Sequence, residues 1–157
     1  MSVKKVLFVC LGNICRSPLA EGLFRHHVNS RGLNDQYSID SCGTGSWHLG
    51  DPPDERSIEV ARANGIDISR QKARKLDPKD GEAFDLIVAM DRANKRDIQK
   101  ICNITSSTKL VCLREYDMWG SGKIDVPDPY YGEVNGFVEV FNIVDRSTRA
   151  LLDSLED

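Results

Sequence analysis

The sequence has 157 residues, of which 40% are hydrophobic and 29% charged, and its formal net charge is −3. This length fits one domain with a substantial core, so we expect a single domain over residues 1–157. The net charge and the lack of a basic block argue against nucleic-acid or membrane partners. The N-terminal apolar run is too short for a signal peptide or a membrane span, so we expect a cytoplasmic protein.

Strands and helices are predicted to alternate along the chain. The continuous apolar run at residues 6–9 is typical of a strand covered on both faces of a parallel sheet. Ser17 is a suitable N-cap and Pro18 suits the first helical position, so a helix is predicted from there to Gly32. There follow a strand at 37–42, a glycine-rich loop at 43–53, a helix at 55–64, a strand at 86–89, a helix at 91–101, a strand at 110–113, an irregular segment at 114–134 and a C-terminal helix with apolar residues from 137 to 155.

This order of elements indicates an α/β fold. Strands that alternate with helices form parallel sheets with right-handed crossovers, and such sheets bind ligands at the carboxyl ends of their strands. Cys10 stands at the end of the first predicted strand. We therefore expect the functional site in the loop that follows it.

Residues 10–17, Cys-Leu-Gly-Asn-Ile-Cys-Arg-Ser, connect that strand to the first helix. The backbone N–H groups of such a loop can converge on an anion, and the helix adds its positive end. The same field favours a thiolate at Cys10, and Arg16 supplies a charged fork for two phosphate oxygens. The segment predicts an enzyme with a cysteine nucleophile rather than an inert core cysteine.

The cysteines indicate a reducing compartment. There are five, at positions 10, 15, 42, 102 and 112, and none has C-x-x-C spacing. An odd number without that spacing argues against a disulfide scaffold and a zinc site. We expect no metal and no other cofactor.

Two motifs resemble those of a known family. Residues 10–17, followed by Pro-Leu-Ala-Glu, resemble the signature of the low-molecular-weight protein tyrosine phosphatases, and residues 126–132, Val-Pro-Asp-Pro-Tyr-Tyr-Gly, resemble its Asp-Pro-aromatic loop. Weaker similarity lies at 41–51 and 89–91. The resemblance implies a three-layer αβα fold with a four-stranded parallel sheet. It also implies a monomer or weak dimer that hydrolyses phosphotyrosine in proteins, and aryl phosphates, without a metal.

The resemblance assigns roles that the chemistry supports. Cys10 would form a cysteinyl-phosphate, while Arg16 and the loop amides bind the phosphate oxygens. Asp128 would be the general acid and base; it competes with Asp117 and Asp125, but prolines on both sides stiffen its backbone. The expected phosphate-binding loop comprises Leu11, Gly12, Asn13, Ile14, Cys15 and Ser17.

Further residues match family positions around the loop. Ser41 is expected to support the loop, and Trp47, Tyr130 and Tyr131 to wall the substrate cleft, although aromatics of this kind are often only partly buried core residues. Cys15 would form a reversible disulfide with an oxidised Cys10, or simply pack in the loop. Arg70 is a departure, since relatives often carry a histidine there that supports the loop asparagine.

Three alternative functions remain open. In a protein-arginine phosphatase, threonine is typical where Ile14 stands. A thioredoxin-coupled arsenate reductase needs additional cysteines after the third strand, and residues 91–101 contain none. A non-catalytic module that binds phosphorylated residues could lose Cys10 or Asp128, and both are present.

Overall fold

The structure is a computed structural model that describes residues 3–157. Its single sheet contains four parallel strands in the order β2-β1-β3-β4. These strands are β1 (Lys4–Cys10), β2 (Tyr37–Gly43), β3 (Leu86–Ala89) and β4 (Lys109–Cys112). The predicted α/β fold with four parallel strands is confirmed.

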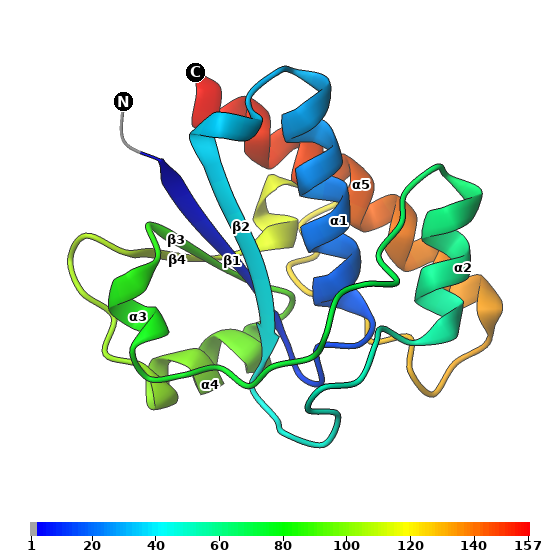
Figure 1. The fold of residues 1–157 in the computed structure, drawn as a ribbon, viewed down its shortest axis with the longest axis horizontal. Coiled ribbons are helices and arrows are strands. Elements are labelled where there is room, and N and C mark those ends of the chain that lie inside the picture. The colour runs from blue at the N-terminus through cyan, green and yellow to red at the C-terminus, as the bar shows by residue number, and fades with distance from the viewer. Residues whose placement is uncertain (1–2) are drawn as a thin grey trace.

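Five α-helices and two short 3-10 turns are described in residues 3–157. The helices are α1 (Arg16–Ser30), α2 (Glu55–Ala63), α3 (Asp80–Ala83), α4 (Arg92–Ile101) and α5 (Val134–Glu156), and the turns are Asn34–Gln36 and Leu113–Tyr116. Helix α1 covers β1 and β2 and packs against α5, while α4 contacts β3 and β4 from the other face (Figure 1). The sheet therefore lies between two helical layers, as expected.

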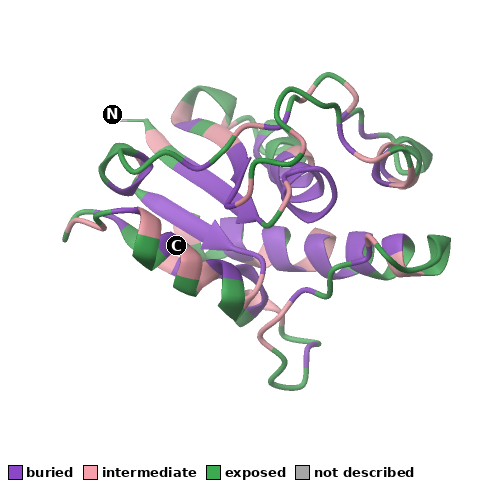
Figure 2. Ribbon diagram, turned by 90° about the horizontal axis from the view of Figure 1, so that it is seen from below, coloured by how far each residue is buried: buried purple, intermediate pink, exposed green. Residues whose placement is uncertain are grey.

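The core occupies both faces of the sheet. Val6 and Phe8 of β1 pack with residues of α1 and α5, whereas the alternate residues Leu7 and Val9 pack with Ile98 of α4. Side chains of a strand alternate between faces, so a run that is apolar at every position is buried on both. Figure 2 shows the strands buried and the exposed residues on loops and outer helix faces.

One predicted helix boundary is wrong. Helix α1 begins at Arg16 with Cys15 in the N-cap position, so Ser17 lies inside the first turn. The Ser17 hydroxyl is instead engaged by Asn13 and Cys10. Pro18 is tolerated because the first N–H groups of a helix have no intrahelical acceptor.

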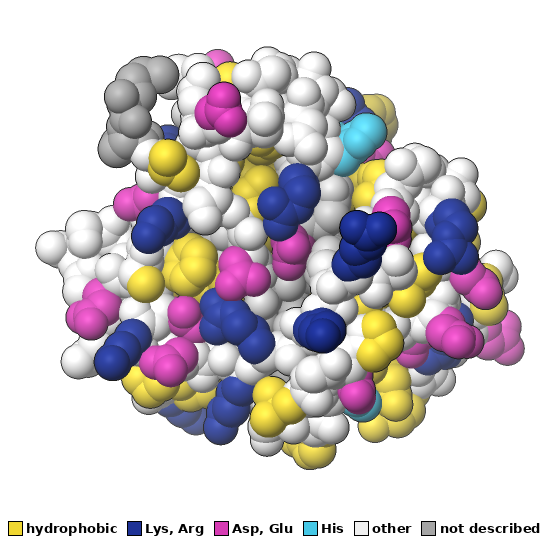
Figure 3. All heavy atoms as spheres, viewed as in Figure 1, with side chains coloured by type: hydrophobic (Ala, Val, Ile, Leu, Met, Phe, Trp, Pro, Cys, Tyr) yellow, Lys and Arg dark blue, Asp and Glu magenta, His cyan; other side chains and the backbone are white. Residues whose placement is uncertain are grey.

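Positively and negatively charged side chains are mixed on the face of the described residues that Figure 3 draws. Within residues 3–157, no helix is both long enough and apolar enough to cross a membrane.

Candidate active site

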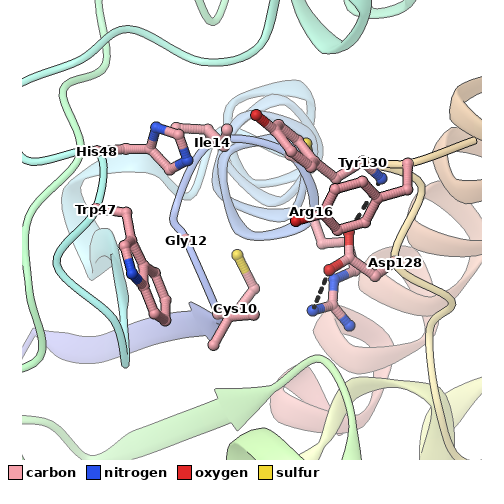
Figure 4. A pocket seen from close by; sticks show the side chains of 11 residues that line it. Cys10, Gly12, Ile14, Arg16, Trp47, His48, Asp128 and Tyr130 are labelled. Atoms are coloured by element: carbon pink, nitrogen blue, oxygen red, sulfur yellow. Dashed lines mark hydrogen bonds and ion pairs between the residues drawn. The ribbon is translucent and has the colours of Figure 1, made fainter.

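A cavity of about 360 Å³ opens at the carboxyl end of β1. The loop that joins β1 to α1 forms its floor, and the segments 47–48 and 128–131 form its walls (Figure 4). Its lining residues are Cys10, Leu11, Gly12, Ile14, Cys15, Arg16, Trp47, His48, Asp128, Tyr130 and Tyr131. Segments from distant parts of the sequence therefore meet at the edge of the sheet where the site was predicted.

The sulfur of Cys10 lies at the base of this cavity. The residue is only 3% exposed, and in Figure 4 its Sγ points into the space between Trp47 and Asp128. The backbone N–H of Asn13 donates to Sγ at 3.3 Å, and the Ser17 hydroxyl lies 3.0 Å from it. Sγ of Cys10 therefore has two hydrogen-bonding neighbours, one backbone N–H and one hydroxyl.

Asn13 holds the loop in its curved conformation. Its φ of 57° lies in the left-handed region, which asparagine tolerates better than most residues. Its side-chain amide donates to the hydroxyls of Ser17 at 2.8 Å and Ser41 at 3.1 Å, and its carbonyl accepts the backbone N–H of Arg74 at 3.0 Å. The structure thus joins the three polar residues that the sequence associated with the loop.

The partners of this network were only partly predicted. The Ser41 hydroxyl donates to the carboxylate of Glu21 at 2.7 Å, and neither Glu21 nor Arg74 was singled out from the sequence. Arg70, expected from the sequence to depart from the family pattern, is exposed. Asn13 therefore has its polar partners supplied by other segments of this chain.

Gly43 allows β2 to pass close to the loop. A Cβ atom at this position would lie 2.8 Å from the carbonyl oxygen of Leu11 and 3.1 Å from the nitrogen of Asn13. Both atoms belong to the backbone and cannot move without disturbing the loop. A glycine is therefore required at the end of β2.

Arg16 projects from the first turn of α1 into the cavity wall. It is 2% exposed, and its Nη1 donates to Asp91 at 2.6 Å and to the carbonyl of Val126 at 2.9 Å. Burial opposes its charge, but Cys10, Asp91 and Asp128 nearby raise its pKa further. The guanidinium is therefore a fixed positive charge beside the sulfur.

Asp91 has two functions in the structure. Its Oδ1 accepts the N–H of Asn94 and caps α4, while its Oδ2 binds Arg16. The capping role follows from its position before a helix, whereas the contact with Arg16 depends on the tertiary fold.

Asp128 is the acidic side chain that faces the sulfur. Its Oδ2 lies 3.6 Å from Nη2 of Arg16, its Oδ1 accepts the N–H of Tyr130 at 3.2 Å, and its side chain is 40% exposed. In Figure 4 it lies across the cavity from Trp47 and His48. A carboxyl in this position can exchange a proton with a leaving group or with water.

The two competing carboxylates in the same segment bind arginines elsewhere. The side chain of Asp117 is buried, and although burial opposes its ionisation, hydrogen bonds from Arg146 and Arg114 hold its pKa below the usual range. Asp125 is paired with Arg92, whose hydrogen bonds lower its pKa as well. Neither residue lines the cavity, and Asp128 does.

Aromatic residues wall the opening of the cavity. Trp47 and Tyr131 are 71% and 94% exposed, and Tyr131 packs edge-on against Tyr130. His48 also lines the cavity, and the centre of its ring lies 6.0 Å from that of the Tyr130 ring. The three predicted aromatics therefore meet at one opening, where flat walls can enclose a phenyl ring.

Cys15 lies on the same cavity as Cys10 and is 4% exposed. Burial, with the nearby charges of Asp54 and Cys10, raises the pKa of its thiol. Ionisation of the Cys15 thiol is therefore disfavoured, and Cys15 lines the cavity that Cys10 also lines. The three other cysteines are also buried and free.

Comparison with known proteins agrees with this geometry. The family model "Low molecular weight phosphotyrosine protein phosphatase" matches residues 5–157. The chain is 48% identical to the Schizosaccharomyces pombe protein of that name over 94% of each chain. Its structure is similar to that of a protein tyrosine phosphatase from Entamoeba histolytica, with a TM-score of 0.91, 35% identity, and coverage of 98% of this chain and 97% of the other. It is also similar to a Drosophila arginine phosphatase, with a TM-score of 0.89, 30% identity and 98% of each chain covered.

Proposed function

We propose that this chain, which belongs to the low molecular weight phosphotyrosine protein phosphatase family and is a protein-tyrosine phosphatase, acts through a cysteinyl-phosphate on Cys10 without a metal ion. The observation that carries the proposal is the position of the Cys10 sulfur. It receives the N–H of Asn13 at 3.3 Å in a cavity that Arg16 and Asp128 also line. Nucleophile, cation and acid thus face one space.

In the first step, the Cys10 thiolate attacks phosphorus. A sulfur–phosphorus bond forms as the bond from phosphorus to the tyrosine oxygen breaks, and Asp128 gives its proton to the departing phenolate. A donor is valuable because the phenol has a pKa of about 10 and its anion is a poor leaving group. Arg16 and the loop amides stabilise the charge on the phosphoryl oxygens.

In the second step, water attacks the phosphorus of the intermediate. Asp128, now a carboxylate, takes a proton from that water, and the sulfur–phosphorus bond breaks. The products are inorganic phosphate and the Cys10 thiolate. One carboxyl thus donates and then accepts a proton, which returns the enzyme to its starting state.

The lining of the cavity favours an aromatic phosphate over a phosphorylated arginine. Ile14 offers an apolar branched side chain where arginine phosphatases tend to have threonine, and Tyr130 provides a flat wall. The similarity to the Drosophila arginine phosphatase makes phosphoarginine the second candidate. Tyrosine-phosphorylated proteins are therefore the substrates that we propose.

Cys15 is proposed to protect the nucleophile from oxidation. A peroxide would oxidise Cys10 to the sulfenic acid, and the Cys15 thiol would then displace water to give a Cys10–Cys15 disulfide. The position of both residues on one cavity supports this reaction. A dithiol reductant would restore both thiols and the activity.

The setting of the enzyme is inferred from the sequence. The five free cysteines support a reducing compartment, for which we propose the cytoplasm. We propose that residues 1–157 form one phosphatase domain that acts as a monomer or weak dimer. Nucleic acid and membranes are not among the partners we propose.

Hydrolysis of p-nitrophenyl phosphate in the presence of EDTA tests the proposal. Cys10→Ser should abolish turnover, because the hydroxyl is a far weaker nucleophile. Asp128→Asn should reduce kcat/KM by about 10²-fold or more for tyrosine phosphate and less for p-nitrophenyl phosphate. Loss of activity in EDTA, or full activity of Cys10→Ser, would contradict the mechanism, and a higher kcat/KM for phosphoarginine peptides would contradict the substrate.

A further inference from the structure

The segment that carries Asp128 is held from both sides. Before it, Val126 donates its N–H to the carbonyl of Met90 at 2.8 Å and accepts a hydrogen bond from Arg16 at 2.9 Å. After it, the carbonyl of Tyr130 accepts a hydrogen bond from another arginine. The backbone of Asp128 thus lies between two fixed points.

The arginine on the second side is Arg56 of α2. Its Nη2 donates to the carbonyl of Tyr130 at 3.0 Å, and its Nη1 donates to the carbonyl of Gly132 at 3.2 Å. Tyr130 is also the residue whose N–H holds the carboxylate of Asp128. Arg56 therefore holds the carbonyl of the same residue whose N–H binds the candidate acid.

Arg56 is itself fixed by two neighbours. Its Nε and Nη2 bind the two carboxylate oxygens of Asp54 at 3.0 Å and 2.9 Å. Its guanidinium carbon lies 4.3 Å from the centre of the Phe137 ring, which is fully buried. A guanidinium held by a bidentate carboxylate and an aromatic face has little freedom to move.

Asp54, the partner of Arg56, also contacts the phosphate-binding loop. The N–H of Asp54 donates to the carbonyl of Ile14 at 2.8 Å. The start of α2 therefore joins the loop that holds the nucleophile to the segment that carries the acid. Asp54 and Arg56 therefore fix the position of the loop that carries Cys10 relative to the segment that carries Asp128.

Only arginine can make this set of contacts. Its planar fork donates here to a carboxylate and to two separate carbonyls. Lysine has one nitrogen on a flexible stem and cannot span these acceptors together. Its charge could still pair with Asp54. An Arg56→Lys variant therefore keeps the positive charge but loses the set of hydrogen bonds.

We propose that Arg56 is a positioning residue for acid catalysis, which sets the place of Asp128 relative to Cys10 by holding Tyr130 and Gly132. This inference rests on the proposed role of Asp128. Arg56 does not line the cavity and need not touch the substrate. Its loss should therefore weaken proton donation and leave attack by the sulfur intact.

This role makes the effect depend on the leaving group. Proton donation matters most for a basic leaving group such as tyrosine and least for p-nitrophenolate, and kcat/KM reports the step in which the leaving group departs. We expect Arg56→Gln and Arg56→Lys to reduce kcat/KM about tenfold for tyrosine phosphate and to change it little for p-nitrophenyl phosphate. Arg149→Gln, which removes an exposed arginine paired with Asp145 on α5, is the matched control and should leave both values unchanged.

A double-mutant cycle with Asp128→Asn completes the test. If Arg56 acts through Asp128, adding Arg56→Lys to Asp128→Asn should cause no further loss with tyrosine phosphate. Equal losses for both substrates, multiplied losses in the double variant, or wild-type activity of Arg56→Lys would overturn the positioning role. If the melting temperature shows that the Arg56→Gln protein is unfolded, the Arg56→Lys variant alone tests the positioning role. A leaving-group-independent loss in Asp128→Asn alone would refute the proposed acid instead.

Discussion

Asn13→Ala is the substitution whose effect the structure defines best. It removes three hydrogen bonds, those to Ser17, Ser41 and the N–H of Arg74, each contributing about 1 kcal/mol. It also places alanine at a φ of 57°, which costs about 1 kcal/mol or slightly more. We expect the free energy of unfolding to fall by about 4 kcal/mol, the sum of these effects.

Asn13→Gly separates the two effects. Glycine loses the same three hydrogen bonds but adopts a positive φ without strain, so it should be about 1 kcal/mol more stable than Asn13→Ala. Urea denaturation of the three proteins at pH 7 gives both differences. A loss below about 1 kcal/mol for Asn13→Ala, or a glycine variant less stable than the alanine variant, would refute the reasoning.

Three further predictions concern other parts of the molecule. Asp117→Asn should lower the free energy of unfolding by about 3 kcal/mol at pH 7. Because the pKa of Asp117 is lower in the folded state, this contribution is complete above about pH 4 and is lost as the pH falls through the folded pKa. A difference in unfolding free energy between wild type and variant that stayed constant down to about pH 2 would contradict this prediction. Gly45→Ala should raise KM for tyrosine phosphate with kcat unchanged, because a Cβ would lie 1.9 Å from the Trp47 ring and displace that wall; an unaltered KM is the opposing result. After treatment with peroxide, the wild type should recover in dithiothreitol and Cys15→Ser should not, whereas equal recovery would argue against a Cys10–Cys15 disulfide.

The sequence was sufficient for the features that depend on local pattern. Continuous apolar runs identified β1, β3 and β4, and the spacing from Cys10 to Arg16 located the loop that faces the cavity. The start of α1 was predicted wrongly because Ser17 has the preferences of an N-cap, while in the fold its hydroxyl is engaged beside the Cys10 sulfur. Helix α3 (Asp80–Ala83) was not predicted, since four residues are too few to show a helical period.

The contacts that complete the site could not be predicted in this way. Glu21, Arg74 and Arg56 reach the site through packing between elements far apart in the chain, and a charged residue on a helix or loop usually marks only a solvated surface. The choice of Asp128 over Asp117 depended on flanking prolines, and the structure adds a physical reason in the arginines around Asp117. Local chemistry thus indicates the reacting groups, and the fold supplies their partners.

The most direct test of the account is to trap the phosphorylated enzyme. Rapid mixing with p-nitrophenyl phosphate, acid quenching and peptide mass spectrometry should locate a phosphoryl group on Cys10. The Asp128→Asn variant should accumulate more phosphorylated Cys10 if the substitution slows hydrolysis of the cysteinyl-phosphate more than formation of the cysteinyl-phosphate. A phosphoryl group on another residue, or turnover of Cys10→Ser at the wild-type rate, would contradict the central claim.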